Sequence, residues 1–188
     1  MKNEIQIGTQ IWMTTNIDVE HFRNGDPIPE VRDEDEWVAA GEAGKPAWCF
    51  YDNDPANGEK YGKLYNLYAV NDPRGLAPEG WHIPSNAECE ILADFLGGEE
   101  SAGAKMKSTY GWVHNGNGNN ESGFSGLPGG YRDAKGSFCF IEEFGFWWGS
   151  PEYDSGDAWS ATLSYTFSRL DLEYPGRESG FSVRCLRD

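Results

Sequence analysis

Histidine, cysteine and positive charge are all scarce in this chain, and their scarcity excludes several classes of function. Three histidines and four cysteines occur among 188 residues, and no two cysteines form a CxxC pair. Because zinc sites need closely spaced ligands, no zinc motif is present. Lysine and arginine number 15 against 31 acidic residues, which gives a net charge of −16. A nucleic-acid partner needs a basic face, so we expect none.

Long apolar runs are also missing. No segment approaches the roughly 18 apolar residues that span a bilayer, so we expect no membrane insertion. The first residues, MKNEIQIGTQIWM, lack the apolar stretch of a secretory signal peptide. Two interpretations stay open. Either a leader has been trimmed and the protein is extracellular or at the cell surface, or the chain is virion-associated, tail-associated or cytoplasmic.

Aromatic residues, by contrast, make up 14% of the chain, and 24 glycines and 10 prolines interrupt it. This composition is typical of short strands and many loops around a ring-rich core rather than of a helical bundle. We find no internal repeat and no linker, so residues 1–188 are predicted to form a single domain. The oligomeric state is left open.

The first half contains the helix signals. Residues 4–12 alternate around a Gly-Thr turn and predict a hairpin. An acidic start predicts a short helix over 33–43, and the apolar stripe within 61–71 predicts another. The clearest signal is Ser85 followed by Glu88, a capping box that predicts a helix over 86–96. AWCFY reads as a strand, and DNDPANG after it as a polar turn.

The second half contains the strand signals. Gly- and Asn-rich loops separate five short aromatic runs, FCFI, FWWGS, AWSATL, FSRLDL and FSVRCL. Each run has the length of a strand, and the spacing predicts antiparallel pairing. The sequence therefore predicts an α+β fold with segregated elements.

Catalytic signatures are absent. There is no G-x-S-x-G elbow, and the acids gather in solvated runs such as 33–36. His82 stands between Trp81 and Ile83, where a packed histidine is expected. We predict no catalytic residue and no enzyme, with an enzyme of unknown chemistry as a lesser alternative.

Oxygen-rich loops raise the question of calcium. Residues 52–57 and 115–121 concentrate Asp, Asn and Glu, but neither matches the spacing of an EF-hand. Asn, Asp and Gly also form turns without any ion. We predict no metal and no cofactor, and leave calcium open at these loops.

Residues 146–174 form the best candidate for a binding surface, because rings alternate there with short polar residues. Neighbouring residues of a strand point to opposite faces, so Trp147 and Trp148 are not both expected to be buried in a one-sided sheet. Tyr165 is the first choice for a central ring. The predicted ligand-binding residues are Trp148, Glu152, Tyr153, Asp154, Asp157, Tyr165, Phe167 and Tyr174.

Several motifs, in order, carry a resemblance to a known family. They are IGTQIWMTTNI, YGKLYNLYAV, GWHIPSNAE, KMKSTYGW, GFSGLPGGYR, FWWGS with AWSA, and GFSVRCLRD. Together they resemble the Fibrobacter succinogenes major paralogous domain, a family of bacterial and often surface-associated domains, over about residues 5–188.

The resemblance implies a C-type-lectin-like fold related to formylglycine-generating enzymes. Two helices, at 61–71 and 86–96, would flank a mixed or antiparallel sheet, and a loop-rich half would face the ligand. The terminal strands would pair, Ile5–Trp12 beside Phe181–Leu186. Cys89 stands where the family usually has Trp, which implies a core position and would allow a Cys89–Cys185 bridge. The disulfide state of Cys49, Cys89, Cys139 and Cys185 is left open.

Two activities of related proteins, the cysteine chemistry of the enzymes and the calcium-dependent sugar binding of lectins, are not expected in this chain. The enzyme relatives need two reactive cysteines close together in sequence, which this chain lacks. The calcium tripeptides of lectins, such as E-P-N or W-N-D, are missing as well.

We therefore expect a non-enzymatic binding or adhesion module that recognises a glycan or a protein through its C-terminal loop-and-strand face. The alternative is a receptor-binding or variable protein of a phage or injection system. Residues 150–178 are rich in Ser, Tyr, Asp, Gly and Thr, which an adenine-mutagenised template can encode.

Overall fold

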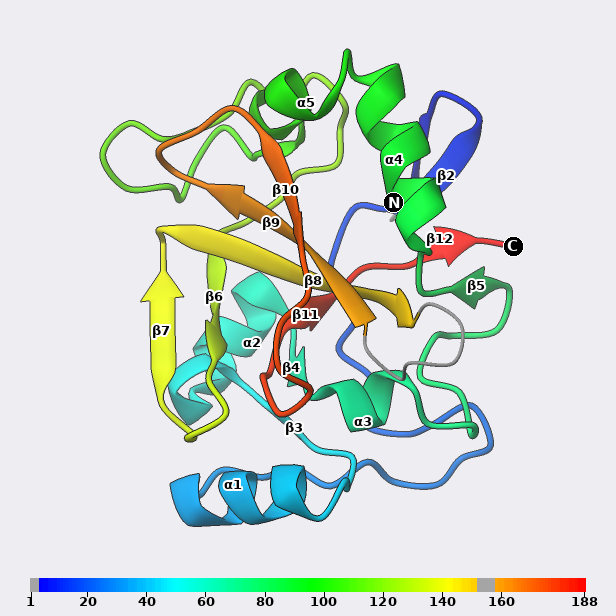
Figure 1. Ribbon diagram of the computed structural model, residues 1–188, viewed down its shortest axis with the longest axis vertical. Helices are drawn as coiled ribbons and strands as arrows, with labels where there is room; N and C mark the ends of the chain where they lie inside the picture. The colour runs from blue at the N-terminus through cyan, green and yellow to red at the C-terminus, as the bar shows by residue number, and fades with distance from the viewer. Residues whose placement is uncertain (1–3, 152–157) are drawn as a thin grey trace.

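A twisted six-stranded sheet runs through the middle of the protein, with helices above and below it (Figure 1). The computed structural model describes residues 4–151 and 158–188. The helical elements are α1 (Glu34–Glu42), the 3-10 turn η1 (Tyr51–Asn53), α2 (Pro55–Tyr61), α3 (Leu67–Val70), α4 (Asn86–Phe95) and α5 (Glu99–Met106). The strands are β1 (Glu4–Ile7), β2 (Gln10–Met13), β3 (Trp48–Cys49), β4 (Leu64–Tyr65), β5 (Trp81–His82), β6 (Gly129–Arg132), β7 (Phe138–Ile141), β8 (Phe144–Pro151), β9 (Ala158–Ser164), β10 (Leu170–Glu173), β11 (Ser182–Val183) and β12 (Leu186–Arg187). The fold is α+β, as predicted. No helix of the described residues is both long and apolar enough to cross a membrane.

The large sheet has the strand order β10-β9-β8-β6-β7, and β11 also pairs with β8. Neighbouring hairpins, β6 with β7, β8 with β9 and β9 with β10, are antiparallel as expected. The prediction was wrong for the last run, because β11 pairs with β8 in parallel. A parallel pair joins segments distant in sequence, which local spacing does not reveal.

The two ends of the described chain lie side by side, as predicted. Leu186 of β12 pairs antiparallel with Trp12 of β2, and these two strands lie close together at the right of Figure 1. The Met13 amide donates to the Cys185 carbonyl at 3.1 Å. An ion pair of 3.2 Å joins Arg187 to Glu4.

Two predicted helices are confirmed by their caps. Ser85 and Glu88 form the complete capping box at the start of α4. At α1, the Asp33 carboxylate accepts from the Glu36 amide at 3.1 Å. In both cases the cap satisfies backbone donors that the helix itself leaves free.

The predicted helix over 61–71 was wrong. Leu64 and Tyr65 form β4, which pairs with β3, and the Tyr65 amide donates to the Phe181 carbonyl at 2.8 Å. Only Leu67–Val70 remains helical, as α3. Leu64, Leu67 and Val70 are buried in both arrangements, so the apolar stripe did not distinguish them. The polar segment DNDPANG is also partly helical, because Asp54 caps α2.

Both faces of the large sheet are covered, which corrects the expectation for the tryptophan pair. Trp147 packs in one cluster with α4 and α5 residues such as Leu92 and Met106. Trp148 packs in a second cluster with Val70 of α3 and with Phe181. Trp147 is 4% and Trp148 0% exposed, because a layer lies on each side of β8.

Four buried cations hold the loops together in this acidic chain: Lys63, Lys107, Arg132 and Arg184. The Lys107 ammonium donates to the Ser164 and Phe167 carbonyls, each at 2.9 Å. Hydrogen bonds from charged groups are the stronger kind. These side chains therefore fix long loops that have few backbone partners of their own.

The cysteines are free. Cys49, Cys89 and Cys185 are buried, and Cys139 is half-buried. Cys89 is in the core, as the resemblance implied. The Cys89–Cys185 bridge that the resemblance would allow is not formed: both thiols are free and belong to different core clusters.

Candidate functional site

Four partly exposed rings share one face of the large sheet, and we call them the aromatic face: Tyr131, Phe140, Phe144 and Phe146. Side chains alternate along a strand, so Phe144 and Phe146 of β8 point to the same side as the buried Trp148. The face is therefore buried at the Trp148 end of β8 and open at the Phe144 end.

The rings of the aromatic face touch in a continuous series. Phe144 lies 5.8 Å from Phe146 with the rings nearly parallel, and 5.3 Å from Phe140. Tyr131 stacks on Phe140 at 6.0 Å. Tyr165, which packs on the other side of the sheet, meets the end of this series edge-on at Phe144, at 6.4 Å. Contacts in this range are favourable and fix the ring orientations. The result is a rigid aromatic surface.

Phe140 is the most exposed member of the aromatic face, at 49%. Its backbone has φ of +61°, a left-handed conformation that costs a non-glycine residue about 1–2 kcal/mol. Such strain persists where other contacts determine the position, and it is common at functional sites. Here it holds a large ring at the surface, next to the turn between β7 and β8.

A polar strip borders the aromatic face on β9. Ser160, Thr162 and Ser164 are buried opposite Trp148, Phe146 and Phe144. Within residues 4–151 and 158–188, the hydroxyls of Ser160 and Thr162 have no hydrogen-bond partner. Unpaired buried hydroxyls are unusual, because each costs desolvation free energy.

The residues predicted from sequence fall into three groups. Trp148 is fully buried, and its indole N–H donates to the Tyr65 carbonyl at 2.8 Å, so it presents no surface in this structure. Tyr165 is half-buried and packs against the Trp147 cluster on the other side of the sheet, so it is not part of the aromatic face. Phe167 and Tyr174 are 51% and 64% exposed. The remaining predicted residues, Glu152, Tyr153, Asp154 and Asp157, lie outside the described residues.

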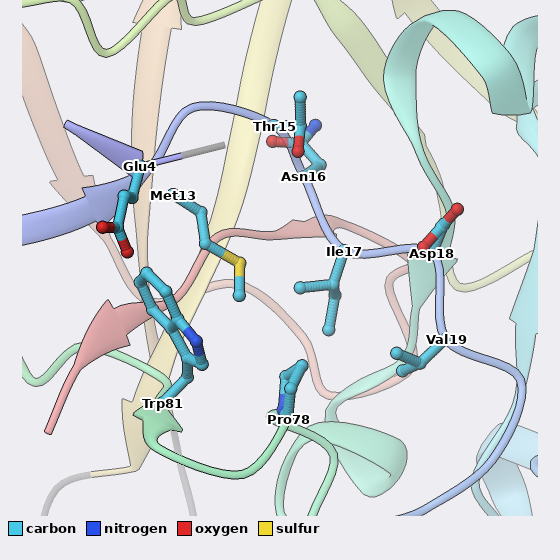
Figure 2. Close-up of a pocket in the computed structure, with 9 residues that line it drawn as sticks. All are labelled: Glu4, Met13, Thr15, Asn16, Ile17, Asp18, Val19, Pro78 and Trp81. Atoms are coloured by element: carbon cyan, nitrogen blue, oxygen red, sulfur yellow. The ribbon is translucent and has the colours of Figure 1, made fainter. Parts of the chain in front are cut away.

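Two clefts flank the segment Thr14–Val19, away from the aromatic face. Figure 2 shows the first, of about 320 Å³, where Met13 and Ile17 approach Trp81 and Pro78 and the Asp18 carboxylate points away. Its lining is mainly apolar.

The second cleft, of about 480 Å³, is more polar. We call it the Arg184 cleft. Its lining residues are Thr14, Thr15, Asn16, Asp18, Gly58, Glu59, Lys60, Tyr61, Gly62, Tyr110, Ser125, Leu127 and Arg184.

Asn16 connects the two clefts to the core. Its Oδ1 atom accepts from the Trp147 indole at 2.8 Å and from Arg184 at 2.7 Å, and its Nδ2 donates to the Tyr61 carbonyl at 2.7 Å. These contacts satisfy every polar atom of the amide. The segment between the clefts is therefore rigidly placed.

His82 bridges two carboxylates and is not the packed histidine expected from sequence. Its Nε2 lies 3.0 Å from Glu88 and its Nδ1 2.9 Å from Asp188, and its side chain is 36% exposed. Burial lowers the pKa of His82, but the hydrogen bonds to Asp188 and Glu88 outweigh it, so the pKa is raised. The histidine thus ties the last residue to the start of α4.

The oxygen-rich loops use side-chain oxygens to cap their own backbone. Asp54 accepts from the Ala56 amide, Asn117 from Trp112 and Asn120 from Ser125. Among the described residues, no group of three or more His, Cys, Asp or Glu is arranged to hold a metal ion. Turn formation accounts for these contacts.

Comparison with known proteins decides the family. The family model described as the Fibrobacter succinogenes major domain matches residues 5–187. The chain belongs to this family. No curated protein and no solved structure matches it.

Sequence reasoning missed much of the surface of this Fibrobacter succinogenes major domain. Tyr131 stands in GGYR, apart from Phe140 and Phe144 in the run FCFIEEFGF, and the pairing of β6 with β7 and β8 brings it beside them. Arg184 had a visible signal, since it is a cation inside the apolar run FSVRCL. A charge in such a run is rarely buried without a specific partner.

Proposed function

We propose that this domain is a non-enzymatic binding module that recognises a glycan through its aromatic face. The observation that supports it is the continuous, partly exposed series of four rings, with one ring held outward by a left-handed backbone. Rigid rings offer a large contact area with little loss of side-chain entropy, and they stack on the apolar faces of sugars.

A glycan is favoured over a protein partner because carboxylate groups border the rings. The exposed Glu142 adjoins the aromatic face at the turn, and Asp171 of β10 lies opposite Thr162. A few placed polar groups beside rings are typical of small-ligand sites. Adhesion at the cell surface would be the corresponding role.

The finer fold assignment belongs to the same proposal. We propose that the α+β fold is of the C-type-lectin-like type. Paired terminal strands, a capped helix after β5 and a loop-rich second half support it. In that arrangement a rigid scaffold presents loops and strand edges to a ligand.

A glycan array with matched variants tests the function. Phe140→Ala and Phe144→Ala should each weaken binding to the retained glycans about tenfold or more, because central rings dominate such surfaces. The control is Phe95→Ala, since Phe95 is 63% exposed on α4, whose buried residues pack against the other face of the sheet. Melting temperatures should show that all three variants are folded.

Two results would contradict the proposal. One is an array on which the wild-type protein binds no glycan. The other is equal loss of binding in the control and in the aromatic-face variants. Capture of a defined protein ligand through Phe144, with no glycan bound, would favour the protein alternative.

A further inference from the structure

The Arg184 cleft has a positively charged floor. Arg184 is 2% exposed, and no carboxylate of the described residues forms an ion pair with it. Its guanidinium contacts Asn16 and the carbonyl of Phe124, and both Asn16 and the following Ser125 line the cleft. The charged end of the side chain therefore lies at the cleft, with the Phe124 ring stacked on it at 4.2 Å.

The guanidinium has unused donors. Of its five N–H groups, Nε and one on Nη2 donate to Asn16, and one on Nη1 donates to Phe124. In the part of the chain that the structure describes, one N–H on each terminal nitrogen has no acceptor. A pair of donors on the two terminal nitrogens matches the two oxygens of a carboxylate.

Another buried arginine shows what a purely structural role looks like. Arg132 donates to four backbone carbonyls, those of Gly136, Val31, Arg32 and Asp33, at 2.7–3.1 Å. Arg184 reaches only one carbonyl, and burial lowers its pKa to about 9. A buried cation with so few hydrogen-bond acceptors retains much of its desolvation cost, and a nearby anion would stabilise it.

Other residues of the cleft suit a hydroxylated anion. Lys60 adds a second cation at the rim, and the hydroxyls of Thr14 and Tyr110 lie in the lining. Ser125 is held at φ of +57°, a strained conformation for a serine. The volume of about 480 Å³ accommodates one or two sugar rings.

We propose that the Arg184 cleft binds the carboxylate of a hexuronic acid, with Arg184 as the direct anion contact and Lys60 as a second cation. The site is separate from the aromatic face and does not depend on the function proposed for it. The acids of the lining, Asp18 and Glu59, are exposed, so water screens their repulsion, whereas burial strengthens the attraction of Arg184.

Titration of the ¹⁵N-labelled full chain tests the proposal. The Arg184 Nε–H signal should shift and saturate with sodium glucuronate at constant ionic strength. Glucose, which lacks the carboxylate, should cause no shift. N-acetylglycine, a carboxylate without a sugar ring, should bind about tenfold more weakly. Equal binding of N-acetylglycine would overturn the assignment to a uronic acid and point to a peptide carboxylate.

Variants decide which residues carry the binding. Arg184→Lys keeps the charge but loses the paired donors. It should weaken glucuronate binding tenfold or more, because about one charge-assisted hydrogen bond is lost. Lys60→Gln changes an exposed side chain, so this variant stays informative even where Arg184→Lys fails to fold. The affinity for glucuronate should fall about threefold, as expected for the loss of one partly screened charge. Lys135→Gln, at the exposed β6–β7 turn, is the matched control.

Three results would overturn the proposal: no shift with glucuronate, unchanged affinity in Lys60→Gln, or equal weakening in Lys135→Gln. Phe144→Ala should bind glucuronate normally, which separates this site from the aromatic face.

Discussion

The Oδ1 atom of Asn16 accepts two hydrogen bonds from the guanidinium of Arg184, at 3.1 Å from Nε and 2.7 Å from Nη2. This contact joins the segment after the first hairpin to the segment before the last strand. It fixes both walls of the Arg184 cleft and positions the only side-chain acceptor that Arg184 has among the described residues.

Asn16→Ala should therefore destabilise the protein by about 2–4 kcal/mol. It leaves the buried donors of Arg184 and Trp147 without an acceptor, and unpaired buried groups are costly. Urea unfolding measures the change. Thr15→Ala, at the exposed neighbouring position, should stay within about 0.5 kcal/mol of the wild type. A loss below 1 kcal/mol in Asn16→Ala would show that this network is dispensable.

The His82 bridge should make stability depend on pH. The raised pKa of His82 means that its contribution is complete below the unfolded value of 6.5 and is lost as pH rises through the folded value. Burial raises the pKa of Glu88, but the hydrogen bonds from Ser85 and His82 outweigh burial and lower the pKa below 4.5. The contribution of Glu88 to stability is therefore lost as pH falls through that lower pKa. The bridge is strongest between about pH 4.5 and 6.5.

His82→Gln should thus lower the melting temperature at pH 5.5 more than at pH 8.5. Because the side chain is partly exposed, the difference should be about 0.5–1 kcal/mol, or about 1–4 °C. His21→Gln, at an exposed loop position, serves as the control. If His82→Gln lowered the melting temperature by the same amount at both pH values, that result would contradict the bridge.

Thiol reactivity should single out Cys139. Burial raises the pKa of Cys49, Cys89 and Cys185 to about 12, and these thiols are enclosed in the core. A colorimetric thiol reagent at pH 8 should modify one thiol in the native protein and four in guanidinium chloride. In the native Cys139→Ser variant, the reagent should modify no thiol. Detecting only two thiols after unfolding without reductant would instead indicate a disulfide.

The backbone of Phe140 provides a test of strain. Glycine normally destabilises a strand, but at φ of +61° it adopts the conformation without a steric cost. Phe140→Gly should therefore be more stable than Phe140→Ala by about 1 kcal/mol in urea unfolding. The same pair of substitutions at Phe138, where φ is not positive, should show the opposite order.

Local signals in the sequence were sufficient for several elements. Ser85 and Glu88 specify the start of α4 because a capping box satisfies backbone donors within four residues. The Gly-Thr turn in residues 4–12 specifies the first hairpin, since its strands are adjacent in sequence. The ordered motifs identified the family across nearly the whole chain.

Other features depend on partners far away in the sequence. Tyr65 is in a strand because Trp48 and Phe181 pair with it, although its neighbourhood also fits a helix. Trp148 was assigned to the surface, but α3 and Phe181 cover its side of β8. The burial of a strand residue depends on what packs over its face, and no local pattern contains that information.

The sequence by itself therefore determined the family, the α+β class, the capped helix and the pairing of the ends. Only the tertiary structure decided which rings are exposed and which cation lines a cleft. The reason is physical: caps and turns act within a few residues, whereas the aromatic face and the surroundings of Arg184 form where strands from distant parts of the chain meet.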